Sequence, residues 1–225
     1  MANAKHILRN NGLTLVWGAL FVVFLAAQAL TGYRVYNQEQ QEHGERAESL
    51  AGYLTTGHFG EAVFENWESE FLQMGMFVIL TAFLFQKGAS ESKDPDKDHE
   101  PVDEDPRLHR DDPGAPGPVR RGGLGLTLYE NSLSLVLGTL FLASFALHAV
   151  TGRAEYSAEQ VQHGGLPATL MDYATSAQFW FESFQNWQSE FMSVAVLTVL
   201  SIWLRQRSSP ESKPVHKPHS ATGND

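Results

Sequence analysis

The sequence of 225 residues contains no cysteine. This excludes disulfide bonds, thiolate metal sites and cysteine nucleophiles. The sequence also lacks any block of five or more basic residues, and its net charge of −10 argues against nucleic-acid binding. Gly-rich phosphate loops, Gly-x-Ser-x-Gly elbows and His-Glu-x-x-His motifs are absent as well. We therefore expect neither an enzymatic activity nor a cofactor.

Charge is also missing from two long apolar stretches, residues 10–33 and 131–152. Each exceeds the roughly 18–20 residues that a helix needs to span about 30 Å of hydrocarbon. Two shorter apolar stretches, residues 71–86 and 191–204, reach that length only together with the aromatic turns before them. The sequence therefore predicts an all-α membrane protein with four membrane-spanning helices.

The two halves of the chain are copies of each other at an offset of 120 residues (187 − 67 = 120). Between the first copy, 8–93, and the second copy, 128–213, about 33 of about 86 aligned positions are identical without a gap, which indicates a duplication. The repeated motifs begin in the first copy at Thr31-Gly32, Glu39-Gln40, His43-Gly44, Phe64-x-Asn66-Trp67-x-Ser69-Glu70-Phe71 and Glu91-Ser92-Lys93. Each copy holds two predicted spans, so we predict two tandem-repeat helical hairpins that enter the membrane in the same direction, with interfacial helices on the outer side.

The first apolar stretch also has features of a signal peptide. Lys5 and Arg9 precede it, and the small-residue pattern at 27–29 resembles a cleavage site. The corresponding stretch of the second copy begins at Asn131, where no signal peptide can lie. We therefore expect an uncleaved anchor, and a cleaved signal peptide is the alternative.

The predicted organisation is a first hairpin at 1–87, a flexible acidic Pro-rich linker at 88–123, a second hairpin at 124–207 and a disordered tail at 208–225. Of the 16 Lys and Arg residues, only Arg34, Arg46 and Arg153 lie in the loops inside the hairpins, and 16 − 3 = 13 lie elsewhere. The positive-inside rule then places both termini, the linker and the tail in the cytoplasm. Both hairpin loops should face outward.

The Asn-Trp-x-Ser-Glu-Phe block, the Thr-Gly motif and the Glu-Gln-x-x-His-Gly loop resemble a family of bacterial four-span membrane proteins known as a domain of unknown function. The resemblance covers both copies, which is nearly the whole chain outside the linker and tail. It implies a protein of the bacterial inner membrane, and it implies no catalytic residue.

Polar residues of the repeated block fall where each second span should enter the membrane. They are Asn66, Trp67, Ser69 and Glu70, with the counterparts Asn186, Trp187, Ser189 and Glu190. An ionisable group at this depth is costly, so Glu70 and Glu190 are candidate functional groups. Gln28 and His148 lie at a similar depth on the other arm of each hairpin, and we predict a contact of Glu190 with His148. The same reasoning pairs Glu70 with Gln28. Such pairs would relay protons or bind a cation, or they would fix helix packing by hydrogen bonds.

Two further pairs have the spacing of helical metal ligands. Glu39 with His43, and Glu159 with His163, lie four residues apart and therefore share one helix face. Two such pairs would supply four ligands to a metal ion. The alternative is a solvated helix that ends at the following glycine, where a histidine is favourable beside the last carbonyl groups.

We expect a non-enzymatic inner-membrane protein that acts as an accessory, scaffold or envelope component. Its surroundings would be the lipid bilayer, and its partner another membrane protein or a second copy of the chain. The centres of the predicted spans offer only small or hydroxyl residues, whereas transporters usually keep polar groups near the midplane. The alternatives are a small transporter or ion-conducting protein that uses the interface carboxylates, and a metal-binding protein on the outer face.

Overall fold

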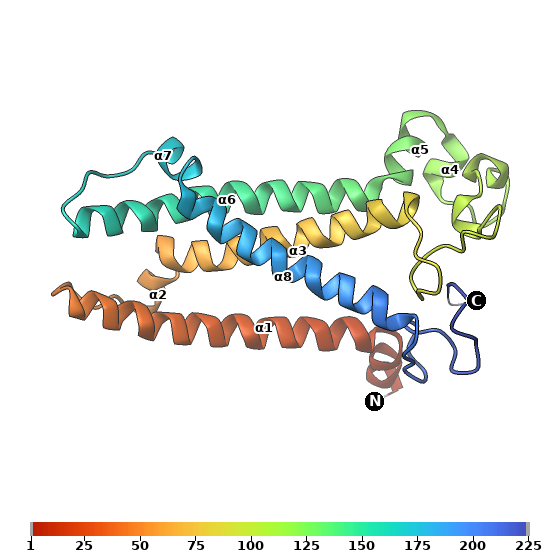
Figure 1. Cartoon of the computed structure of the whole chain (residues 1–225), viewed down its shortest axis with the longest axis horizontal. Helices are drawn as coiled ribbons and strands as arrows, with labels where there is room; N and C mark the ends of the chain where they lie inside the picture. The colour runs from red at the N-terminus through yellow and green to blue at the C-terminus, as the bar shows by residue number, and fades with distance from the viewer. Residues whose placement is uncertain (1, 224–225) are drawn as a thin grey trace. The chain divides into compact units, whose positions relative to one another are not determined.

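The computed structural model describes residues 2–223, with side chains from His6 onward. The described chain is helical and contains no β-strand, which confirms the all-α prediction. The long helices are α1 (Ala2–Glu42), α3 (Gly57–Phe83), α6 (Ser132–Gln162) and α8 (Ala177–Ser201) (Figure 1). The short helices are α2 (Leu50–Tyr53), α4 (Gly117–Arg121), α5 (Gly123–Glu130) and α7 (Leu170–Ala174), with 3-10 turns η1 (Pro101–Asp103) and η2 (Pro106–His109).

Two helices of the described chain are long and apolar enough to cross a membrane. They are His6–Glu42 within α1, with a mean hydropathy of 2.2, and Ser132–Gln162, with a mean hydropathy of 2.0. The other two predicted spans form the C-terminal parts of α3 and α8, which are not among these helices. Both helices also end earlier than predicted, at Phe83 and Ser201 instead of 86 and 204.

The same type of turn follows α3 and α8. After α3 the chain turns back, and the backbone N–H of Gln86 donates to Ser92 Oγ at 2.8 Å. After α8 the backbone N–H of Gln206 donates to Ser212 Oγ at 2.9 Å. A backbone N–H that is bonded to a serine hydroxyl does not continue the helical ladder. The repeated Glu-Ser-Lys motif is therefore a turn that follows each of these helices.

The chain divides into two compact units, and each combines segments of both copies. Unit 1 comprises Met1–Val63 and Leu147–Ser176, which hold α1, α2, the start of α3, the end of α6 and α7. Unit 2 comprises Phe64–Ala146 and Ala177–Asp225, which hold the rest of α3, the linker, the start of α6 and α8.

In unit 1, the two copies build the same helix end and return. Gly44 after α1 and Gly164 after α6 both have positive φ, 77° and 79°. Glycine adopts this left-handed conformation without a steric penalty, so it closes a helix at its C-terminus. The chain then returns to a short helix that is capped by the Ser49 side chain in α2 and by the Thr169 side chain in α7.

The returning chain of unit 1 is tied to the long helix by one side chain in each copy. Asn37 Oδ1 accepts from the backbone N–H of Glu48 at 2.6 Å. Ser157 Oγ, which occupies the corresponding position in α6, accepts from the backbone N–H of Ala168 at 3.1 Å. These bonds fix the start of α2 and α7, and each of these helices carries a tyrosine.

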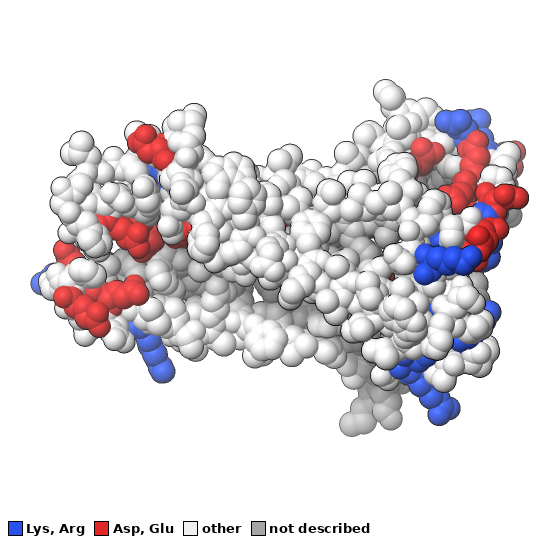
Figure 2. Space-filling view, viewed as in Figure 1, with Lys and Arg blue, Asp and Glu red and all other residues white. Residues whose placement is uncertain are grey.

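In unit 2, the linker and the tail make contacts with the ends of the helices. Lys213 is 1% exposed, and its Nζ donates to the carbonyl oxygens of His219 at 2.9 Å, Ala221 at 2.8 Å and Gly88. Charged side chains gather over the linker around α4 and α5 (Figure 2). The sequence predicted a flexible linker and a disordered tail; both form turns in the structure, and their mobility in solution stays a prediction.

The apolar side chains of α1 in unit 1 point outward. None of the apolar window of α1 is buried, and Trp17 and Phe24 are 63% and 65% exposed. The surface over the middle of this helix carries no charge in the view of Figure 2. At 41 residues α1 is about 60 Å long, so it is longer than the roughly 30 Å that hydrocarbon requires.

Candidate functional site: a buried tyrosine network in unit 1

Tyr173 of α7 is completely buried, and its hydroxyl group packs against the backbone of α6 at Gly152. A Cβ atom on Gly152 would lie 2.7 Å from Tyr173 Cζ and would overlap the hydroxyl. Tyr53 of α2, which is 1% exposed, meets Gly32 of α1 in the same way, and a Cβ atom there would lie 3.1 Å from Tyr53 Cζ. The Thr-Gly motif of each copy is therefore the place where a tyrosine approaches the helix.

The hydroxyl of Tyr173 joins two titratable side chains. Its oxygen donates to Glu61 Oε1 at 2.9 Å and lies 3.3 Å from Nε2 of His148, which is completely buried. A hydroxyl group has one proton, so with that proton donated to Glu61 the Nε2–H of His148 donates to the hydroxyl oxygen. Glu61, Tyr173 and His148 thus form a hydrogen-bonded series within unit 1.

The start of α3 brings Glu61 to this series because two glycines let α3 approach α6 closely. A Cβ atom on Gly57 would lie 2.7 Å from the carbonyl oxygen of Thr151, and one on Gly60 would lie 2.6 Å from its Cγ2. Neither glycine is repeated, since Ala177 and Trp180 stand at the corresponding positions. This close approach therefore belongs to α3 alone.

The other tyrosine has different polar partners. Tyr53 Oη lies 3.2 Å from Nδ1 of His58, and Gln28 Nε2 donates to the carbonyl oxygen of Ala62 at 3.3 Å. Gln28 occupies the position of His148, and Phe181 occupies the position of Glu61. The contact of tyrosine with glycine is thus common to both copies, whereas the titratable partners are not.

Unit 2 buries a carboxylate that sequence reasoning did not select. Glu68 of α3 is 0% exposed and accepts hydrogen bonds from Ser183 Oγ at 2.8 Å and from Trp187 Nε1 at 3.2 Å. Ser183 is also completely buried. Donors from α8 therefore compensate for the removal of this carboxylate from water.

Three side chains of the predicted interface block hydrogen-bond within their own helix. Ser69 Oγ donates to the carbonyl oxygen of Asn66 at 2.8 Å, and Ser189 Oγ donates to that of Asn186 at 2.9 Å. Asn186 Nδ2 donates to the carbonyl oxygen of Glu182 at 3.1 Å. These three bonds do not join helices.

The remaining residues of the block have separate environments. The ring of Trp67 packs on Phe64 at 5.7 Å between centroids, and Trp187 is bonded to Glu68 as described above. Glu70 and Glu190, both in unit 2, are close enough to interact electrostatically. The predicted contacts of Glu190 with His148 and of Glu70 with Gln28 each join residues of different units, and they stay predictions.

The histidines of the proposed metal-ligand pairs lie at helix ends. Nδ1 of His43 donates to the carbonyl oxygen of Glu39 at 2.9 Å, and Nδ1 of His163 donates to that of Glu159 at 2.8 Å. Each histidine ring thus bonds a carbonyl group of the last helical turn, which also accepts from the backbone N–H of the same histidine. This geometry supports the helix-end alternative, and the metal site stays a prediction.

Sequence reasoning missed Glu61 and Glu68 because it searched for repeated residues, and Phe181 and Gln188 replace them in the second copy. A signal was present nonetheless. Glu61, Glu65 and Glu68 are spaced by four and three residues in the part of α3 that precedes its apolar stretch. That spacing places three carboxylates on one helix face, which is unusual beside an apolar stretch.

A family model described as "Domain of unknown function (DUF6766)" matches residues 4–224. Among curated proteins and among solved structures, no match to the chain is found. The match agrees with the resemblance that the repeated motifs indicated, at the level of a family without an assigned function. The chain belongs to the DUF6766 family.

Proposed function

We propose that this chain is a bacterial inner-membrane protein with four spans in two tandem hairpins, and that it is a non-enzymatic accessory or scaffold component. Both termini and the linker lie in the cytoplasm in this proposal. The outward-facing apolar side chains of α1 support insertion in lipid, and the distribution of Lys and Arg supports the orientation. The C-terminal parts of α3 and α8 are the two remaining spans.

The observation that carries the scaffold role is the repeated contact of tyrosine with glycine. Gly32 with Tyr53 and Gly152 with Tyr173 have the same arrangement, although the titratable groups around them differ. A reaction that was carried out twice would keep its proton-transfer groups in both copies. What the copies share is a short helix that packs against a long helix through the tyrosine–glycine contact, and such a contact stabilises the fold.

The surface next to the Tyr173–Gly152 contact is suited to binding a partner protein. Leu166 and Met171, on the loop before α7 and in α7, are 86% and 70% exposed. Single exposed apolar residues are common, but here they lie on a segment held in place by the Thr169 cap and by Tyr173. A rigid segment with exposed apolar side chains binds a partner at a low cost in conformational entropy.

The test is native mass spectrometry of protein extracted gently from its own membranes, with wild type compared with Gly152→Ala. Gly138→Ala is the matched control, because a Cβ atom on this glycine of α6 meets nothing within 4 Å. The proposal predicts a complex with another membrane protein or a second copy, which Gly152→Ala weakens and Gly138→Ala retains. A bare monomer from wild-type membranes, also after cross-linking in the membrane, contradicts it.

The buried series of unit 1 favours a second candidate, a proton-conducting membrane protein. Glu61, Tyr173 and His148 are bonded in sequence, so a proton that enters at one end can leave at the other. The measurement is proton uptake by liposomes that contain the purified protein, with Tyr173→Phe as the interrupting variant and Tyr53→Phe as its control. Loss of uptake in Tyr173→Phe alone supports conduction, and wild-type uptake equal to that of protein-free liposomes excludes it.

A further inference from the structure

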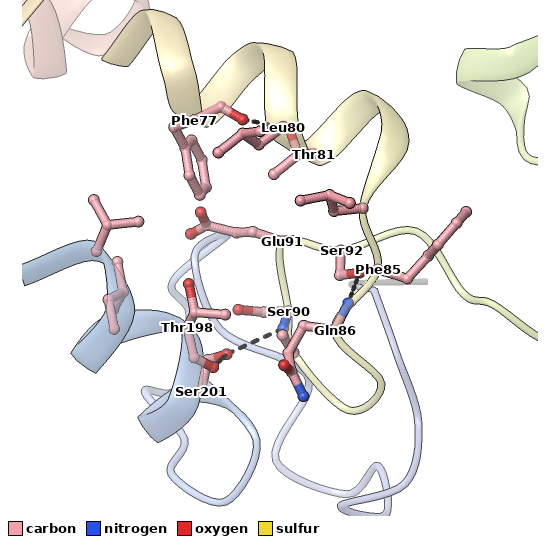
Figure 3. Close-up of a pocket in the computed structure, with 14 residues that line it drawn as sticks. Phe77, Leu80, Thr81, Phe85, Gln86, Ser90, Glu91, Ser92, Thr198 and Ser201 are labelled. Carbon is pink, nitrogen blue, oxygen red and sulfur yellow. Dashed lines mark hydrogen bonds between the residues drawn. The ribbon is translucent and has the colours of Figure 1, made fainter. Parts of the chain in front are cut away.

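Unit 2 contains a cavity that none of the sites above uses. It lies between the C-terminal parts of α3 and α8 and the turn that follows α3, and its volume is about 280 Å³ (Figure 3). Phe77 and Leu80 of α3 and Val194 and Leu197 of α8 form its apolar part. This volume is roughly twice that of the ~150 Å³ apolar cavity known to take up benzene. It suits one aromatic ring with a short alkyl chain, or a segment of a longer chain.

One carboxylate, that of Glu91, faces this apolar space. In Figure 3 its side chain reaches from the turn to a position between Phe77 and Thr198. Glu91 Oε1 is buried and has no hydrogen-bond partner among the described residues. A buried acceptor without a donor costs free energy, so a ligand that donates a hydrogen bond here gains stability.

Three of the hydroxyl groups around the cavity do not serve this acceptor because they donate to backbone carbonyl groups. Thr81 Oγ1 donates to Phe77 at 2.8 Å, Ser201 Oγ to Thr198 at 2.9 Å, and Ser90 Oγ to Glu211 at 3.0 Å. The protons of these three hydroxyl groups are therefore not available to Glu91. What the cavity offers a ligand is an acceptor, and a ligand that fits it must bring the donor.

The charge at the cavity is negative. Burial raises the pKa of Glu91 to about 7, and the neighbouring carboxyl group of Glu211 contributes to this shift. Three cationic side chains in this part of unit 2 have other partners: Lys93 pairs with Asp103 at 2.8 Å, Lys213 bonds carbonyl oxygens, and Arg205 donates to the carbonyl oxygen of Ser201 at 3.2 Å. The contacts of the described residues include no ion pair of these cations with Glu91. A cation is therefore favoured over an anion of the same size.

We propose that this cavity binds a primary amine joined to an apolar body, with the ammonium group donating to Glu91 and the apolar body between α3 and α8. Glu91 recognises the charge, and the apolar side chains recognise the body. An aminophospholipid and a small free arylalkylamine both have this chemistry. The Glu-Ser-Lys turn that follows α3 supplies this carboxyl group, which gives the motif a function in the first copy.

The experiment is calorimetric titration of the full chain in phosphatidylcholine nanodiscs at pH 8, with empty nanodiscs subtracted. The probes are 4-phenylbutylamine and the neutral 4-phenylbutanol, which share the same apolar body. We expect the amine to bind at least tenfold more tightly than the alcohol. Glu91→Gln, which keeps the shape of the side chain, should abolish this difference, whereas Glu104→Gln in the exposed part of the linker should retain it. Leu197→Trp, which fills the apolar part, should weaken both probes.

Equal binding of amine and alcohol to wild type, or an amine preference that survives Glu91→Gln, overturns the proposal, and so does the absence of binding. Circular dichroism of each variant checks that the helices are retained. A second arm distinguishes the two sources of the amine by native mass spectrometry from nanodiscs that also contain phosphatidylethanolamine. Retention of this lipid by wild type and its loss in Glu91→Gln identify a membrane lipid; binding of the soluble amine without lipid retention identifies a free amine.

Discussion

The ring of Tyr173 lies so close to α6 that a Cβ atom at Gly152 would be 2.7 Å from Tyr173 Cζ. Gly32 and Tyr53, each 120 residues earlier in the chain, have the same relationship. The Thr-Gly motif is therefore explained by packing. A hydrogen atom on the helix is the only substituent that lets the tyrosine lie where it does.

Gly152→Ala should destabilise the protein by roughly 1–3 kcal/mol, because the tyrosine must move out of a filled space. Thermal unfolding of the purified protein in detergent measures this. Gly138→Ala in the same helix should be neutral or stabilising by up to about 1 kcal/mol, since its Cβ atom meets nothing and alanine favours the helix. Equal melting temperatures for the two variants would contradict the packing explanation.

Tyr173→Phe should cost more than Tyr53→Phe. The first substitution takes a hydroxyl from both Glu61 and His148 in a buried place, at roughly 1–3 kcal/mol for groups left without that partner. The second takes one contact from His58, at roughly 0.5–1.5 kcal/mol. Thermal unfolding of both variants under the same conditions gives the comparison. The reverse order would show that the series in unit 1 does not stabilise the fold.

Ser183→Ala should destabilise unit 2 by about 1–3 kcal/mol, since the fully buried Glu68 loses a donor at 2.8 Å. Ser189→Ala is the matched control on α8, because its hydroxyl donates to a carbonyl oxygen of its own helix and its removal should change stability by less than about 0.5 kcal/mol. Chemical unfolding in mixed micelles compares the two. A larger loss in Ser189→Ala would speak against the role of Ser183.

Glu91 should make stability depend on pH. Its pKa is raised from 4.5 to about 7, mainly by burial and to a smaller extent by the neighbouring Glu211. At a pH between these two values, the folded chain therefore binds a proton that the unfolded chain has lost. The free energy of unfolding should therefore fall as the pH rises from about 4.5 to about 7 and then level off. Burial also raises the pKa of Glu155 to about 7, so Glu155 contributes to the same fall. Glu91→Gln should therefore remove only the contribution of Glu91 and stabilise the protein at pH 8 by about 1 kcal/mol, a value reduced for contact with water.

Unfolding of wild type and Glu91→Gln at pH 5, 6, 7 and 8 measures this dependence. Glu130→Gln, at the exposed end of α5, should leave the wild-type profile unchanged. A Glu91→Gln profile parallel to that of wild type would show that this carboxyl does not titrate between folded and unfolded states in that window.

The long helices were predictable because their information is local. Uncharged runs predicted the spans in α1 and α6, and the glycine of each His-Gly motif indicated where those helices end. The C-terminal ends of α3 and α8 were predicted too late. Each helix is followed by a turn in which Ser92 or Ser212 bonds the amide group six residues earlier, and such turns do not appear in a count of apolar residues.

The candidate site was less predictable because it depends on contacts between distant segments. His148 was selected because it lies in an apolar helix. Its neighbour Tyr173 could not be selected in this way, because no local sequence pattern indicates that α7 folds back on α6. Glu61 reaches this network only because Gly57 and Gly60 let α3 approach. Repetition in sequence marked the Thr-Gly motif without assigning it a packing role, and it concealed the residues that differ between the copies.

Cysteine labelling tests the proposed membrane topology most directly, and the absence of cysteine from the chain provides a clean background. Single cysteines would replace Glu45, Leu108, Leu166 and Val215, and a membrane-impermeant maleimide would be applied to intact cells and to lysed cells. The last three of these side chains are 80%, 86% and 61% exposed. Four spans predict labelling of intact cells at 45 and 166 and protection at 108 and 215. Labelling at 108 with protection at 166 would contradict this account, because it is the pattern of a protein in which α1 and α6 alone cross the membrane.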